Sequence, residues 1–165
     1  MAGSSAWLFC GVIAPDNSAT VGAGTNISEG TAGSGFGSTS GQLTKNACGM
    51  ACGQRLLSEQ GINVFQSNLA KGFYKGLTPE NLAKNLNRHQ PGWKGFMAEL
   101  TQRDIAGLFS AHGKDIARIG GNPGHFVTVE SVSKGVVKYW DPAGGVARSQ
   151  SIGKFTDIAT GVVFR

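Results

Sequence analysis

In the middle of the chain the apolar residues recur at helical spacing. Cys48, Cys52 and Leu56 lie four residues apart, so on a helix they would share one face. Gly61 follows soon after and is a typical residue to end a helix, because it adopts the left-handed conformation easily. The pattern predicts a helix over 47–60 that buries this stripe.

Two further helices are predicted from their start signals. Thr78-Pro79 is typical of an N-cap followed by the first helical position, and it predicts a helix that runs to about His89. Thr101 and Asp104 have the spacing of a capping box, with Asp in place of Glu, and predict a third helix over Ile105–His112. The central part of the chain is therefore expected to be helical.

After the third helix the pattern changes to short runs rich in Val and Ile. These runs predict strands over 115–119, 126–132, 136–140 and 161–164. Lys134-Gly135 marks a hairpin turn, and 152–159 predicts a short helix before the last strand. Helices followed by an antiparallel sheet indicate the α+β class, with the N-terminal helices packed on a C-terminal sheet.

The first 41 residues differ in composition from the rest. They hold nine of the 26 glycines, and 25–41 consists mostly of Gly, Ser and Thr. Such a segment cannot bury enough surface to offset its ordering entropy. We therefore expect a tail or linker over 1–41 and one folded domain over 42–165. The apolar stretch 6–14 is a weak match to a secretory signal, and we expect the chain to be the C-terminal end of a longer protein.

Charge and cysteine content narrow the function classes. The first 40 residues carry a net charge of −2 and the remainder +7, but the basic residues are scattered. No basic-aromatic pattern indicates nucleic-acid binding, and no segment is long enough for stable membrane insertion. Three cysteines, Cys10, Cys48 and Cys52, argue against a disulfide framework and against a closed metal site, so no metal or cofactor is expected.

Cys48 is the candidate nucleophile. It lies where a loop enters the predicted helix, and a helix N-terminus favours the thiolate through its partial positive charge and free N–H groups. Gly49 after it would let a substrate backbone pass close to the sulfur. The alternative explanation is that Cys48 is a small residue of the core, as free cysteines often are.

Three other residues could complete a catalytic site. His125 begins a predicted strand and is a candidate general base. Asp141 ends the next strand and could hold the His125 Nδ1–H, as the third member of a triad does. Gln42, six residues before Cys48, could donate to an oxyanion. Taken alone, each also has an ordinary structural explanation as a loop or turn residue.

With these residues in this order, the chain resembles the papain-like cysteine peptidases that process bacteriocins and remove double-glycine leaders. The resemblance covers about residues 40–165 and is carried by Gln42 with Cys48-Gly49, by His125-Phe126-Val127, by Asp141-Pro142 and by the terminal Gly161–Phe164. It implies a papain-like fold with Cys48 as nucleophile, His125 as base, Asp141 as orienting acid and Gln42 as oxyanion donor. Met50-Ala51-Cys52 departs from the family pattern, and we expect Cys52 to be buried.

The resemblance implies a cysteine hydrolase that acts on a protein or peptide amide bond. The glycine-rich lead and the basic charge also resemble toxin domains of bacterial competition proteins. We therefore expect a secreted protein, or one delivered into a target bacterium, that acts in a reducing cytoplasm and has a cognate immunity protein. A glutamine deamidase, a transglutaminase or a peptidoglycan amidase on the same fold stays open, as does an inactive binding module.

The other histidines and the tryptophans have structural explanations. His89 and His112 lie at predicted helix ends, where they would suit the negative end of the helix dipole. The aromatic residues Trp93, Phe96 and Trp140 could line a substrate groove, but we expect them in the core.

Overall fold

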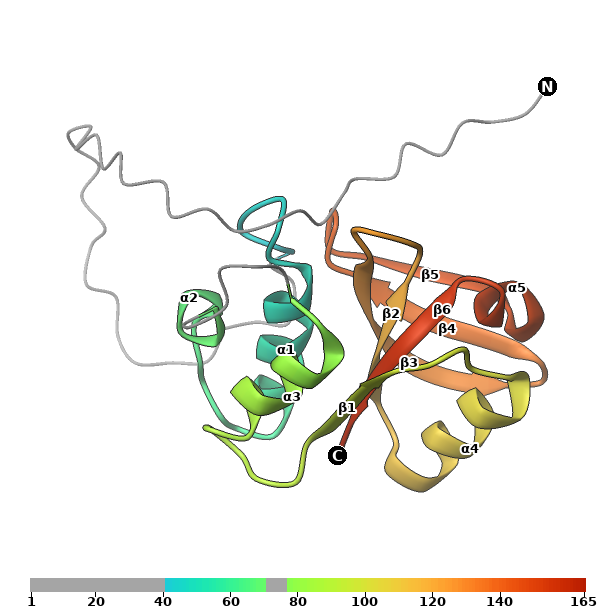
Figure 1. Ribbon diagram of the computed structural model, residues 1–165, viewed down its shortest axis with the longest axis horizontal. Helices are drawn as coiled ribbons and strands as arrows, with labels where there is room; N and C mark the ends of the chain where they lie inside the picture. The colour runs from blue at the N-terminus through green and yellow to red at the C-terminus, as the bar shows by residue number, and fades with distance from the viewer. Residues whose placement is uncertain (1–40, 71–76) are drawn as a thin grey trace.

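The computed structural model describes residues 41–70 and 77–165. Within them a sheet lies between two groups of helices (Figure 1). The expected linker, apart from its last residue Gly41, lies outside the described residues, as do Cys10 and the apolar stretch 6–14. The domain boundary at 41/42 stays a prediction.

The first helical layer consists of α1 (Cys48–Glu59), α2 (Gln66–Leu69) and α3 (Pro79–Leu86). Gly61, with φ of 78°, follows the end of α1 as predicted. The Thr78 side chain accepts a hydrogen bond from the Asn81 N–H at the start of α3, which confirms the predicted N-cap. These three helices are on the left of Figure 1.

The sheet is antiparallel throughout and has the strand order β1-β6-β2-β3-β4-β5. The strands are β1 (Lys94–Met97), β2 (Asp115–Ile119), β3 (His125–Ser133), β4 (Val136–Asp141), β5 (Val146–Ser151) and β6 (Ala159–Phe164). Because β3 and β4 are antiparallel neighbours, the start of β3 lies beside the end of β4. This brings His125 and Asp141 to the same end of the two strands.

The other face of the sheet is covered by two helices, α4 (Gln102–His112) and α5 (Ile152–Thr156). The capping box of Thr101 and Asp104 at the start of α4 is formed as predicted. Two buried clusters result. One joins α1 and α3 to Phe126 and Trp140 on one face of the sheet. The other joins α4 and α5 to side chains on the opposite face of the sheet.

The fold class and the order of helices before strands are confirmed, but three elements were not predicted. These are α2, β1 and β5. Both strands lie at the edges of the sheet and are mostly exposed, so their sequences lack an alternating apolar pattern. Trp93 and Trp140 are buried as expected, whereas the expectation for Phe96 was wrong, because it lies on the edge strand β1 and is 40% exposed.

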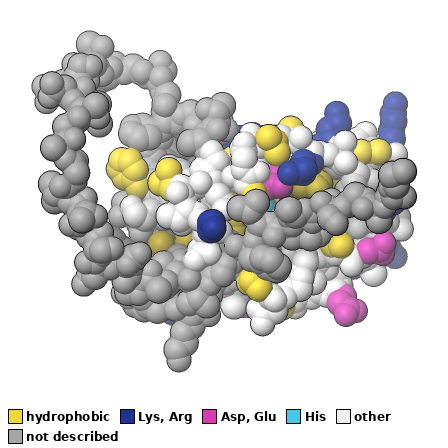
Figure 2. Space-filling view, turned by 90° about the horizontal axis from the view of Figure 1, so that it is seen from above, with side chains coloured by type: hydrophobic (Ala, Val, Ile, Leu, Met, Phe, Trp, Pro, Cys, Tyr) yellow, Lys and Arg dark blue, Asp and Glu magenta, His cyan; other side chains and the backbone are white. Residues whose placement is uncertain are grey.

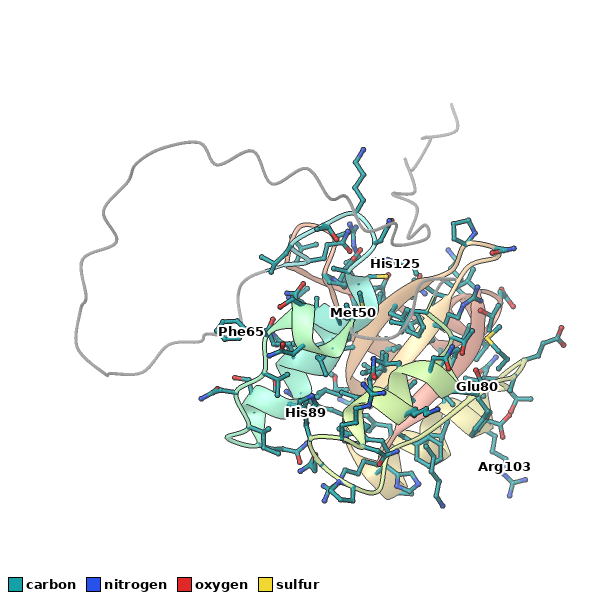
Figure 3. The ribbon with its side chains drawn as sticks, turned by 60° about the vertical axis from the view of Figure 1, so that its left-hand side comes forward. Met50, Phe65, Glu80, His89, Arg103 and His125 are labelled. Carbon is teal, nitrogen blue, oxygen red and sulfur yellow. The ribbon has the colours of Figure 1, made fainter. Side chains whose placement is uncertain are left out.

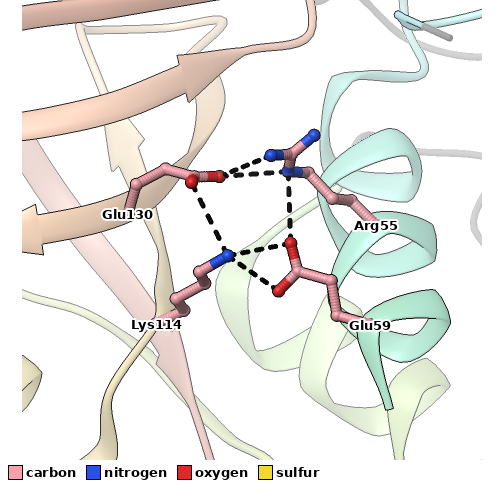
Figure 4. Close-up of polar contacts among 4 residues, drawn as sticks. All are labelled: Arg55, Glu59, Lys114 and Glu130. Atoms are coloured by element: carbon pink, nitrogen blue, oxygen red, sulfur yellow. Dashed lines mark hydrogen bonds and ion pairs between the residues drawn. The ribbon is translucent and has the colours of Figure 1, made fainter. Parts of the chain in front are cut away.

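A network of four charged side chains connects the first helical layer to the sheet (Figure 4). Arg55 on α1 donates to Glu130 on β3 at 2.8 and 3.0 Å, and Lys114 next to β2 lies 2.9 Å from Glu59 on α1. The remaining two pairs, Arg55–Glu59 and Lys114–Glu130, are 3.7 and 3.6 Å apart. All four side chains are partly exposed, so the network adds modest stability. Its geometric effect is to fix α1 against β2 and β3.

Candidate active site

Cys48 is the first residue of α1, as predicted. No side chain caps the start of this helix, and Cys48 is fully buried. The first N–H groups of a helix have no partner within the helix, and its dipole is positive there. The position of Cys48 is therefore one that stabilises a thiolate.

Gly49 has a different role from the one expected. A Cβ on Gly49 would lie 3.2 Å from the Phe126 ring and in contact with Leu77, so the space beside its Cα is filled by the core. The expectation that Gly49 opens a path for a substrate backbone was wrong. Instead, the missing side chain lets the first turn of α1 pack closely on the residue next to His125.

The two cysteines of α1 are in different chemical states. Cys52 is buried and free, and burial raises the pKa of its thiol to about 12. Cys48 is disulfide-bonded in this structure. The cysteine count had not led us to expect a disulfide. A disulfide sulfur is not a nucleophile, so any chemistry at Cys48 requires the reduced thiol.

His125 and Asp141 are brought together as predicted, but through the other ring nitrogen. The His125 Nε2 lies 2.7 Å from the Asp141 Oδ1, which corrects the expected contact through Nδ1. The His125 Nδ1 is buried and has no hydrogen-bond partner among the described residues. With Nε2 fixed by the carboxylate, Nδ1 is the nitrogen that can accept and return a proton.

Asp141 is held by three donors. Besides His125, the Ala143 N–H donates to its Oδ1 at 2.9 Å and the Arg148 Nε donates to its Oδ2 at 2.8 Å. Burial by itself would raise the pKa of Asp141, but the hydrogen bond and charge of His125 and the other two donors outweigh it. The pKa of Asp141 is therefore below its ordinary value, and the carboxylate stays ionised at neutral pH.

Gln42 lies next to this pair. Its backbone N–H donates to the Pro142 carbonyl at 2.9 Å, which places it beside the end of β4. Its side-chain Nε2 donates to the Lys45 carbonyl at 3.1 Å, while Oε1 is buried without a partner among the described residues. A primary amide has two N–H groups, so one remains to donate to a substrate.

The figures show where these residues lie relative to one another. Figure 3 labels His125 and, from the first turn of α1, Met50, and both lie at the upper end of the boundary between α1 and the sheet. Seen from above, a small area of imidazole is visible next to an acidic and a basic side chain (Figure 2). The side chains of His125 and Asp141 are only 13% and 12% exposed, so water has limited access to the pair.

The comparison with protein families identifies the family of the chain. The model of the Peptidase C39 family matches residues 38–164, which is most of the chain and includes every candidate residue. The chain belongs to the Peptidase C39 family. This confirms the resemblance to bacteriocin-processing, papain-like cysteine peptidases.

One solved structure similar to this Peptidase C39 chain is the peptidase domain of Streptococcus ComA, described as a bifunctional ABC transporter involved in a quorum-sensing pathway. The two are 15% identical and superpose with a TM-score of 0.61, covering 75% of this chain and 93% of that domain. At this identity the likeness shows the papain-like fold. No curated protein sequence matches the chain.

Two residues that support the site were not found from the sequence. Arg148 lies on β5 opposite Tyr139, so its contact with Asp141 depends on the register of a strand that was itself missed. Gln66 is a buried amide that contacts the backbone on both sides of Gln42. A buried glutamine gives no signal in a single sequence, because glutamine is usually exposed.

The two other histidines of the chain lie away from the site. The His112 ring packs on Phe164 with centroids 4.6 Å apart, and His89 follows α3. Within residues 41–70 and 77–165 there is no cluster of His, Cys, Asp and Glu that could hold a metal ion. None of the helices in these residues is long and apolar enough to span a membrane.

Proposed function

We propose that this Peptidase C39 chain is a cysteine peptidase with Cys48 as nucleophile, His125 as general base and Asp141 as the acid that orients the imidazole. The observation that carries the proposal is the pairing of His125 and Asp141 through Nε2, which leaves the buried Nδ1 without a partner in the part of the chain that the structure describes. The contact of Gly49 with Phe126 supports it, because it packs the residue after Cys48 against the residue after His125.

The first step forms a thioester. The His125 Nδ1 takes the proton of the reduced Cys48 thiol, and the thiolate attacks the carbonyl carbon of the substrate amide. The carbonyl oxygen becomes an oxyanion, which a Gln42 N–H and backbone N–H groups at the start of α1 stabilise. The imidazolium then gives its proton to the amine as the C–N bond breaks, and the amine leaves.

The second step releases the enzyme. A water molecule gives a proton to the His125 Nδ1 and attacks the thioester carbonyl. The C–S bond then breaks as the imidazolium returns this proton to the sulfur, which forms the acid and the free thiol. Asp141 stays ionised during both steps, since its pKa is lowered, and it stabilises the imidazolium through Nε2. Its role is to fix the tautomer and orientation of the ring.

Substitution of Cys48 tests this proposal. In the presence of a reductant, we expect Cys48→Ala to lower turnover of a peptide with two glycines before a coumarin amide by more than about 10³-fold. The matched control is Cys52→Ala, one turn later on the same helix and equally buried, which should keep activity within about threefold if the fold is intact. Equal activity of Cys48→Ala and wild type would contradict the proposal.

The products distinguish the peptidase from the other acyl-transfer activities of this fold. Mass spectrometry of a treated protein should show new termini from a cut backbone. A mass gain at glutamine would indicate a deamidase instead, and a cross-linked product would indicate a transglutaminase. The expected toxin role, the immunity protein and the site of action stay predictions.

A further inference from the structure

Gln66 is a buried polar residue outside the proposed triad. It is the first residue of α2 and is only 3% exposed. A buried amide destabilises a protein unless its donors and acceptor are hydrogen-bonded. Within the described residues, the hydrogen bonds of this amide are made to two places, the backbone around Gln42 and the side chain of Gln54.

The Gln66 amide pairs with the backbone on both sides of Gln42. Its Oε1 accepts from the Leu43 N–H at 3.1 Å, and its Nε2 donates to the Gly41 carbonyl at 3.3 Å. This is the pattern with which one strand pairs with another, so the amide acts as a short substitute for a neighbouring strand. The backbone of 41–43 is therefore held from this side.

The opposite side of the same segment is held by the end of β4. The Gln42 N–H donates to the Pro142 carbonyl, the residue after Asp141. A Cβ at Gly41 would lie 2.6 Å from the Pro142 oxygen, so glycine is needed for this approach. Gln42 is thus fixed between Gln66 and the strand that carries Asp141.

Gln54 connects this arrangement to the helix of the nucleophile. It lies on α1, six residues after Cys48, and its Oε1 accepts from the Gln66 Nε2 at 3.0 Å. The Leu43 N–H, which can only donate, and the Gly41 carbonyl, which can only accept, decide which end of the Gln66 amide is the donor, and Gln54 accepts the second N–H of that end. One chain of hydrogen bonds therefore runs from α1 through Gln66 to the backbone of Gln42.

We infer that Gln66 is a positioning residue that fixes Gln42 for binding the oxyanion. The inference rests on the proposed peptidase function. Gln66 contacts neither the sulfur nor the imidazole in any hydrogen bond of the described residues, and it acts through Gln42. Loss of the Gln66 amide should therefore impair only steps in which an oxyanion forms.

Gln66→Met tests the inference, because it keeps the length of the side chain and removes its hydrogen bonds. We expect kcat for the two-glycine coumarin peptide to fall about 10- to 100-fold with KM changed less than about threefold, a smaller loss than for Gln42→Ala. Alkylation of Cys48 by iodoacetamide forms no oxyanion, so its rate should stay within about twofold of wild type. In the double variant with Gln42→Ala, Gln66→Met should add less than about twofold.

Asn85→Leu is the matched control. Asn85 is another buried amide of the same helical layer, and it donates to the Leu69 carbonyl without contact to 41–43. It should lower stability comparably but leave kcat within about threefold. If Gln66→Met does not fold, Gln54→Met replaces it, since this change removes only the contact that ties the Gln66 amide to α1, and its kcat should fall by about 3- to 10-fold.

The outcomes separate the two proposals. Wild-type kcat in Gln66→Met, a parallel loss of alkylation, or losses that multiply in the double variant would each overturn the inference and leave the triad standing. If the replacement Gln54→Met is the variant tested, unchanged kcat overturns the inference in the same way. Turnover by Cys48→Ala, or none by wild type, would instead overturn the proposed function.

Discussion

Asp141 and Asp115 are both buried carboxyl groups on strands of the same sheet, with 8% and 2% exposure. Asp141 has three donors around it, and its pKa is lowered. Asp115 begins β2, has no hydrogen-bond or ionic partner within the described residues, and burial raises its pKa to about 8. The two groups have opposite shifts although both are buried.

The difference shows that the partners of a buried acid, more than its burial, decide its charge. The region around Asp141 supplies donors from β3, from β5 and from the turn after β4, so an anion is stable there. The region around Asp115 supplies apolar neighbours such as Val129, opposite it on β3. The surroundings therefore stabilise an ionised carboxylate at Asp141, whereas an ionised carboxylate at Asp115 destabilises the folded protein.

The largest expected effect is on activity at Asp141. We expect Asp141→Ala to lower kcat by about 10²- to 10⁴-fold, because the imidazole loses the acceptor that orients it and stabilises its charge. The kcat of Asp141→Asn should lie between those of Asp141→Ala and wild type. The asparagine oxygen can still accept from His125, but its NH2 group faces the Arg148 Nε–H and cannot accept from it. Steady-state kinetics with a reductant measure both. Equal kcat of Asp141→Ala and wild type would show that the His125 orientation does not depend on this carboxylate.

Asp115 is expected to affect stability and not activity. Because its folded pKa is raised, the folded protein keeps the proton when the unfolded chain has lost it, so stability falls as the pH rises from about 4 to about 8. Below about pH 4 both states are protonated and this loss is absent. We expect Asp115→Asn to be more stable than wild type by about 2 kcal/mol or more at about pH 9, and similar at about pH 3.

Denaturant unfolding at several pH values measures this effect. The control is Asp157→Asn, which replaces an exposed aspartate after α5 and should change stability by less than about 0.5 kcal/mol at either pH. If Asp115→Asn and wild type keep the same stability difference at all pH values, the raised pKa of Asp115 is wrong.

The smallest expected effect is at Arg148. Its side chain is 52% exposed, so its contact with Asp141 is weakened by solvent. We expect Arg148→Met to lower kcat about two- to fivefold. It should also shift the acid limb of the pH–rate profile slightly to higher pH, because Asp141 loses one of the contacts that lower its pKa. A loss as large as that of Asp141→Ala would mean that Arg148 has a more direct role than holding the acid.

Much of the candidate site could be predicted from local signals. Cys48 was placed at a helix start because loop composition changes to helical spacing there, and His125 and Asp141 were placed at the ends of neighbouring strands. Arg148 and Gln66 could not be found, since their contacts join segments far apart in the chain. The prediction that His125 contacts Asp141 through Nδ1 was wrong for the same reason, because the orientation of the ring depends on tertiary packing and not on the order of residues along the chain.

By itself the sequence determined most of the helices and strands, the main caps and turns, and the four residues that are candidates for chemistry. These follow from the spacing of apolar residues and from capping residues, which act within a few positions of the chain. Only the tertiary structure decided that Nε2 of His125 meets Asp141, that Gln66 contacts the backbone on both sides of Gln42, and that Asp115 has no partner among the described residues. Each of these depends on desolvation and hydrogen bonding between distant segments, and these interactions exist only once the segments are packed together.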